Sequence, residues 1–138
     1  AAGTNETGAR LGSAVLTILT CVLTWRIAAI LIRPDVAAWS GIVMATCLWT
    51  GITGRASTPD APLAFFTTLA LWAFVNGART NQSVWRDGPV SISPKSASLV
   101  GAACGLAILT KGPIGLVLPL GGIGLFAWWQ AAVDPGRE

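Results

Sequence analysis

The chain has 138 residues, of which 53% are hydrophobic and 11% charged, with a net charge of +3 and a mean hydropathy of +0.65. Soluble domains carry about 25% charged residues, and a water-soluble domain of this size could not hide so much apolar surface. The positive charge is too small and too scattered for nucleic-acid binding. The apolar residues come in blocks instead of alternating, which predicts an all-α, polytopic helical membrane protein.

The first apolar block, residues 11–32, is long enough to cross the membrane, since about 20 residues span the hydrocarbon layer. Its only charge is Arg26, near the far end, where the long stem can carry the guanidinium back to the interface. The residues before the block are small and polar, without a start methionine or the shape of a signal peptide. We therefore expect a fragment of a longer membrane domain.

The second and third predicted spans are residues 36–53 and 61–76. The turn at residues 33–35 contains a proline between two charged residues, so the second span should run antiparallel to the first. A polar segment, residues 54–62, separates the second span from the third. It places Arg55 and Asp60 at the junction of two membrane-length segments.

The polar stretch at residues 77–95 contains charged residues and helix breakers, which predict a solvent loop. Two further apolar runs follow, at residues 96–110 and 114–133, separated by the break at residues 111–113. Gly101 and Gly105 in the fourth run form a Gly-x-x-x-Gly pair, which offers a smooth face to a neighbouring helix. The motif is weak alone, and ordinary packing is the simpler interpretation of this pair. The sequence thus predicts about five transmembrane helices in one unit.

Five alternating spans predict which polar segments share a side of the membrane. One side receives three basic residues outside the spans and the other receives five, namely Arg10, Arg55 and Lys111 against Arg33, Arg79, Arg86, Lys95 and Arg137. Cytoplasmic loops carry the excess of Lys and Arg. We therefore expect the loop at residues 77–95 in the cytoplasm, and Arg55, Asp60 and Lys111 together on the outer face.

Two of these residues have both a structural and a functional interpretation. Asp60 suits a helix N-cap and the positive end of the helix dipole, but a carboxylate beside a cation at the membrane surface can also act on a polar substrate. Lys111 suits the end of a helix with Gly112 as its cap, or a contact with an anionic group. The residue types alone leave both interpretations open.

Cysteine and histidine give little information about chemistry. The three cysteines lie inside apolar runs without paired spacing and are most simply small buried residues. The chain has no histidine, so a bound divalent metal would need carboxylate ligands. Whether the protein binds such a metal stays open at this point.

Three blocks of sequence resemble the dolichyl-phosphate-mannose protein mannosyltransferase superfamily, which includes bacterial lipid A aminoarabinose transferases. They read RLGS at residues 10–13, GRASTPD at residues 54–60 and GLAILTKGP at residues 105–113. The resemblance implies a multi-pass C-type glycosyltransferase of the plasma (inner) membrane, surrounded by membrane lipids. Such an enzyme transfers a hexose or related sugar from a polyprenyl-phosphate donor to a lipid or protein acceptor at the outer, periplasmic face.

The same resemblance implies roles for individual residues. Asp60 matches a second acidic position of the active site, and Lys111, together with Arg55, falls where basic residues can lie near the donor phosphate. The principal catalytic acid of the family sits in an acidic pair that Glu6 does not match, so we expect that acid outside the fragment. The alternative is a non-enzymatic transporter segment or scaffold subunit, in which Arg55 and Asp60 form a structural ion pair.

Overall fold

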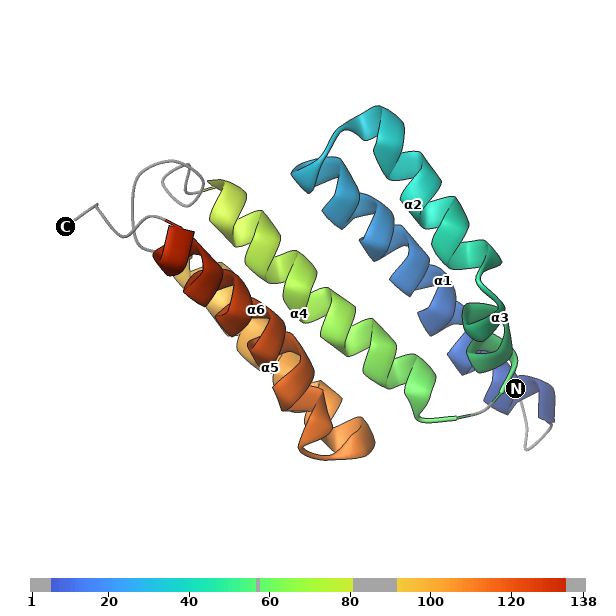
Figure 1. Ribbon diagram of the computed structural model, residues 1–138. Coiled ribbons are helices and arrows are strands. Elements are labelled where there is room, and N and C mark those ends of the chain that lie inside the picture. Colours follow the sequence, from blue (N-terminus) through green and yellow to red (C-terminus); the bar gives the residue numbers. More distant parts are fainter. Residues whose placement is uncertain (1–5, 57, 81–91, 134–138) are drawn as a thin grey trace.

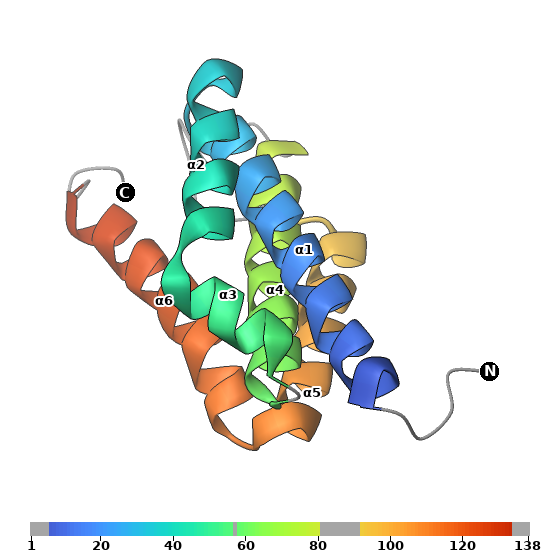
Figure 2. The same cartoon turned by 90° about the vertical axis from the view of Figure 1, so that its right-hand side faces the viewer.

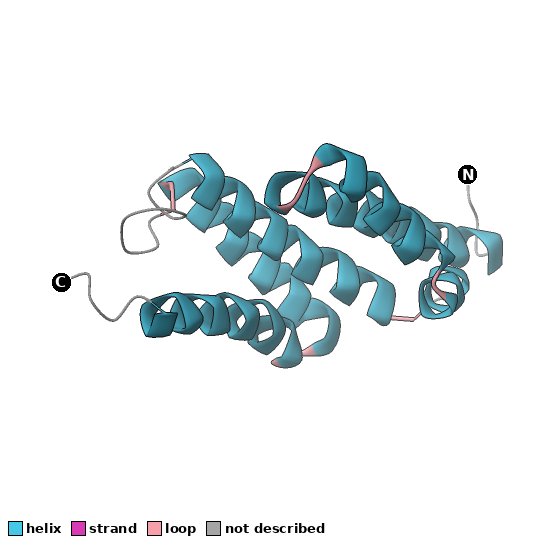
Figure 3. Cartoon of the chain, turned by 45° about the horizontal axis from the view of Figure 1, so that its top comes forward, coloured by secondary structure: helices cyan, strands magenta, loops and turns pink. Residues whose placement is uncertain are grey.

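The computed structural model shows antiparallel helices packed side by side (Figure 1). It describes residues 6–56, 58–80 and 92–133. The regular elements of these residues are all helices, as expected (Figure 3). Their bounds are α1 Glu6–Leu31, α2 Pro34–Thr46, α3 Leu48–Arg55, α4 Asp60–Thr80, α5 Pro94–Lys111 and α6 Ile114–Val133.

Helices α1 and α4 form the centre of the bundle. Helix α1 contacts α2 and α3 on one side, and α4 contacts α5 and α6 on the other (Figures 1 and 2). Successive long helices run in opposite directions, so the start of α4 and the end of α5 lie at the same end of the bundle (Figure 1). This alternation is the one that the sequence predicts.

The second predicted span is not one straight helix. It divides at Cys47 into α2 and α3, whose axes differ by 58°. Cys47 has an extended backbone with ψ of 129°. The sequence predicts a buried cysteine here, but the residue is exposed. The bend turns α3 onto α1, where Gly54 packs against Thr17 so closely that a Cβ on the glycine would lie 3.2 Å from the threonine side chain.

Two helical segments, Arg10–Leu31 and Asp60–Ala78, are long and apolar enough to cross a membrane. The bent α2–α3 pair would add a third crossing if it is one broken span. Helix α6 is apolar over the shorter segment Ile114–Trp129, and five crossings remain a prediction.

Helix α4 continues to Thr80, past the expected start of the loop at residue 77. Most of that loop, residues 81–91, lies outside the described residues.

Small residues allow α4, α5 and α6 to pack closely. The buried core lies between α4 and α5, with partly buried residues of α6 packed against it, and consists of Ala70, Ala73, Phe74, Val100, Ala103 and Cys104. A Cβ on Gly77 would lie 2.5 Å from Ser96, and one on Gly115 would lie 2.4 Å from the backbone of Ala107. By contrast, a Cβ on Gly101 or Gly105 would meet nothing within 4 Å. The Gly-x-x-x-Gly pair therefore makes no close contact with the described residues.

Candidate active site

Two of the three predicted site residues meet at one end of the bundle. Asp60 is the first residue of α4 and Lys111 the last residue of α5, and 51 positions separate them in the sequence. The Lys111 Nζ donates a hydrogen bond to Asp60 Oδ1, which makes the two side chains an ion pair. The lysine side chain is 47% exposed and the aspartate 34%, so a ligand can approach both.

The end of α5 places Lys111. Gly112 adopts a positive φ of 76°, which side-chain-bearing residues rarely adopt, and its N–H bonds to Ile108 O at 2.7 Å. Pro113 follows, and α6 turns back beside α5. The prediction that Gly112 caps this helix is confirmed. Lys111 is thus both the last residue of its helix and the partner of Asp60, so the two interpretations of Lys111 are compatible.

Asp60 sits where the positive end of the α4 dipole favours a negative charge. Among the described residues, its carboxylate bonds to Lys111 and not to a backbone N–H of its own helix. The first turn of α4 is closed instead by the backbone bond from Leu63 N to Pro59 O, at 3.2 Å. The N-cap interpretation therefore does not account for the contact that Asp60 makes.

Arg55 lies at the same end of the bundle but is not part of this pair. It is the last residue of α3, is exposed, and forms no ion pair with a described residue. The Arg55–Asp60 ion pair that the non-enzymatic alternative predicts is therefore not formed. Arg55 is a second cation and lies five residues before Asp60 in the sequence.

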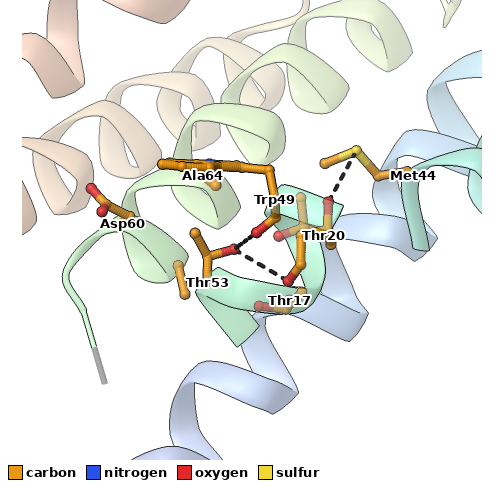
Figure 4. Close-up of a pocket in the computed structure, with 9 residues that line it drawn as sticks. Thr17, Thr20, Met44, Trp49, Thr53, Asp60 and Ala64 are labelled. Atoms are coloured by element: carbon orange, nitrogen blue, oxygen red, sulfur yellow. Dashed lines mark hydrogen bonds between the residues drawn. The ribbon is translucent and has the colours of Figure 1, made fainter. Parts of the chain in front are cut away.

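A pocket of about 60 Å³ lies next to Asp60 (Figure 4). Its lining comes from α1 to α4 and consists of Thr17, Thr20, Met44, Trp49, Thr50, Thr53, Asp60, Ala61 and Ala64. Our sequence reasoning missed this pocket. The available signal was the spacing of the threonines, three residues apart on α1 and again on α3, which puts each pair on one helix face.

The described part of the chain contains no group of three His, Cys, Asp or Glu side chains that could hold a metal ion. Asp60 has a lysine, not a second carboxylate, as its partner. The described site therefore combines one carboxylate and one ammonium group at one end of the bundle.

Comparison with known proteins gives one family. The chain matches the family described as Dolichyl-phosphate-mannose-protein mannosyltransferase over residues 1–137. Two uncharacterized proteins of Aquifex aeolicus (strain VF5) are 30% and 32% identical over 93% and 86% of this chain, which correspond to 26% and 22% of those proteins. No solved structure matches significantly.

A third relative carries an activity in its name. It is the undecaprenyl phosphate-alpha-4-amino-4-deoxy-L-arabinose arabinosyl transferase of Enterobacter sp. (strain 638), 28% identical over 91% of this chain and 21% of the relative. The chain thus spans about a quarter or less of the length of these curated relatives. The match over residues 1–137 shows that the chain, part of an integral membrane protein, belongs to the dolichyl-phosphate-mannose-protein mannosyltransferase family.

Proposed function

We propose that the full-length protein is a membrane glycosyltransferase that takes a sugar from a polyprenyl-phosphate donor, with Asp60 and Lys111 in its active site. The family and the names of the relatives support this class of reaction. The contact between Asp60 and Lys111 is the observation that carries the proposal. It joins an anion and a cation from two different helices at one end of the bundle, where a lipid-linked phosphate would enter from the membrane surface.

Lys111 acts on the leaving group in this proposal. When the sugar leaves the polyprenyl phosphate, the phosphate oxygen gains negative charge, and a fixed ammonium stabilises that charge. The half-exposed lysine can bind the phosphate while the polyprenyl chain stays in lipid. Arg55, exposed at the same end of the bundle, provides a second cation for the phosphate.

Asp60 acts on the acceptor. A hydroxyl or amine attacks the sugar only as it loses a proton, and a positioned carboxylate can take that proton or orient the group that carries it. Lys111 neutralises this carboxylate through the ion pair. A donor phosphate that binds Lys111 would weaken that pairing and leave Asp60 available to the acceptor, which is a lipid or a protein.

The active site faces the outside of the membrane in this proposal. The antiparallel helices support a common side for Asp60 and Lys111 (Figure 1). The excess of Lys and Arg on the opposite side, five residues against three, supports a cytoplasmic location for that side.

The proposal is tested with Asp60→Asn in the full-length protein. Asparagine caps a helix about as well as aspartate, so a purely structural role predicts nearly normal turnover. A role for the charge predicts normal membrane insertion with turnover reduced by roughly 100-fold or more, the usual scale for a positioned acid or base.

The matched control is Asp35→Asn. Asp35 also lies in the first turn of a helix and pairs with a cation, Arg33, at 3.3 Å, but at the opposite end of the bundle. It should keep wild-type turnover. Normal turnover by the Asp60→Asn protein would remove Asp60 from the active site.

A further inference from the structure

One face of α1 has no neighbour in the described part of the chain. Helix α1 contacts α2, α3 and α4, and its remaining side is open in Figure 2. Exposed residues of α1 recur on that side every three or four positions, which is the spacing of one helix face. We call the face formed by Gly12, Val15, Leu19, Val22 and Arg26 the open face of α1.

The apolar residues of the open face do not decide what covers it. Val15, Leu19 and Val22 are 46%, 41% and 40% exposed. Lipid tails are as apolar as these side chains, so lipid and a second helix would suit them equally. A Cβ on Gly12 would meet nothing within 4 Å, which leaves room for another backbone to approach. The remaining residue of the face, Arg26, is the one that discriminates.

Arg26 is a charge inside a membrane-length segment. In the two candidate spans, Arg10–Leu31 and Asp60–Ala78, the other charged residues stand at an end. With a rise of about 1.5 Å per residue, Arg26 lies about 7.5 Å before the end of its span and about 8 Å past the middle. Its side chain is exposed and makes no hydrogen bond or ion pair with a described residue.

The long stem of Arg26 offers one way to avoid an unpaired charge in lipid. It can carry the guanidinium to the near interface, at the C-terminal end of α1. However, the Cα–Cβ bonds of a helix tilt toward its N-terminus, which here leads away from that interface. The helix therefore favours a guanidinium inside the apolar layer, where charged side chains almost always face protein and are paired.

Most of a full-length protein of this kind lies outside the present chain. The chain corresponds to 26%, 22% and 21% of the length of three curated relatives. Further helices are therefore available to cover the open face. The charge of Arg26 selects among them, because a guanidinium pairs best with a carboxylate, which accepts two parallel hydrogen bonds from it.

We propose that the open face of α1 is the docking surface for another transmembrane helix of the same full-length chain, one outside residues 1–138 that carries an Asp or Glu at the depth of Arg26. The carboxylate neutralises the guanidinium, and the helix covers Val15, Leu19 and Val22. This interface is independent of the glycosyltransferase reaction and would hold for any activity of the protein.

Photochemical cross-linking identifies what covers the open face. In the full-length protein, p-benzoylphenylalanine replaces Val22, which lies one turn before Arg26 on the same face. The protein is irradiated in native membranes, and the product is mapped by mass spectrometry. It should migrate as a monomer and join position 22 to a helix outside residues 1–138 that contains an acidic residue within one turn of the linked site.

A double-mutant cycle then tests the pairing. Arg26→Gln is combined with the amide replacement of that acidic residue, and Tm is measured in detergent. Each single variant should lower Tm by a few degrees, because it leaves the other charge unpaired. The double variant should lose clearly less than the sum of the two losses, as residues in contact do.

The matched control for Arg26 is Arg33→Gln. Arg33 lies in the turn that follows α1, and its side chain is 74% exposed and pairs with the equally exposed Asp35. A surface pair of this kind contributes little to stability. The Arg33→Gln protein should therefore keep a Tm close to that of the wild type.

Four results would overturn the proposal. Lipid adducts alone would show that the open face meets lipid and that Arg26 reaches the interface. A product that joins two copies would make the face a contact between protomers, and a product within residues 1–138 would place a helix of this chain there. Additive losses of Tm, or a linked helix without an acidic residue at that depth, would remove the ion pair.

Discussion

The ion pair between Asp60 and Lys111 contributes little to the stability of the fold. Both side chains are partly exposed, and an ion pair of this kind is worth about 0–1 kcal/mol. Each residue would also be acceptable alone, the aspartate at the start of a helix and the lysine at the end of one. What the fold adds is their contact, which brings two charges of opposite sign to one accessible point.

The sequence predicts which charged residues share one end of the bundle better than it predicts which of them contact each other. The three charges were expected on one side of the membrane, and two of them touch. Arg55 could not be placed relative to the pair from the sequence, because its position depends on the direction of α3. The threonines were overlooked because each looks like an ordinary tolerated polar residue in an apolar run, and only the fold shows that they face each other.

Residue types near a helix end predict where the helix ends, but they do not predict which helices contact each other. Gly112 marks the end of α5, as the sequence predicts, whereas α2 begins at Pro34, two residues before the predicted span. No proline or glycine stands at the break at Cys47, so the sequence predicts one continuous span over residues 36–53. The close contacts use Gly77 and Gly115 instead of the Gly101–Gly105 pair, because the choice of glycine depends on which faces meet.

Gly115→Ala tests the contact between α5 and α6. The added Cβ would lie 2.4 Å from the carbonyl carbon and oxygen of Ala107, which are backbone atoms that cannot rotate away. We expect a loss of stability on the order of 1–3 kcal/mol, the usual cost of overpacking, and a lower Tm in detergent.

The matched control is Gly101→Ala, at an exposed position of α5 where the new Cβ meets nothing within 4 Å. It should keep or slightly raise the Tm, because alanine is the better helix former. Equal Tm values for the two variants would show that α5 and α6 do not approach as described.

The two ends of the helix bundle carry different sets of charged residues. Arg55, Asp60 and Lys111 lie at one end, while the α1–α2 turn with Arg33 and Asp35 lies at the other (Figure 1). Alternating apolar blocks were sufficient to predict this arrangement. Which end faces the cytoplasm depends on the count of basic residues, and that count includes loop residues outside the described part of the chain.

Cysteine labelling in intact cells tests the orientation. In the full-length protein, with Cys21, Cys47 and Cys104 replaced by alanine, a cysteine is introduced as Pro59→Cys or as Asp35→Cys, both at exposed positions at opposite ends. An impermeant thiol reagent should label the first and not the second. The reverse pattern would put the ion pair on the cytoplasmic side and contradict an outward-facing site.

The central claim, that Lys111 binds the donor phosphate, is tested most directly by the affinity of the full-length protein for undecaprenyl phosphate. Lys111→Gln should weaken binding by about 1.5–3 kcal/mol, the range for hydrogen bonds to charged groups, and Lys111→Arg should retain part of the affinity. Lys95→Gln, at the opposite end of α5, should bind like the wild type. Equal affinities of the wild-type and Lys111→Gln proteins, both folded, would contradict the claim and leave Lys111 as the end of a helix.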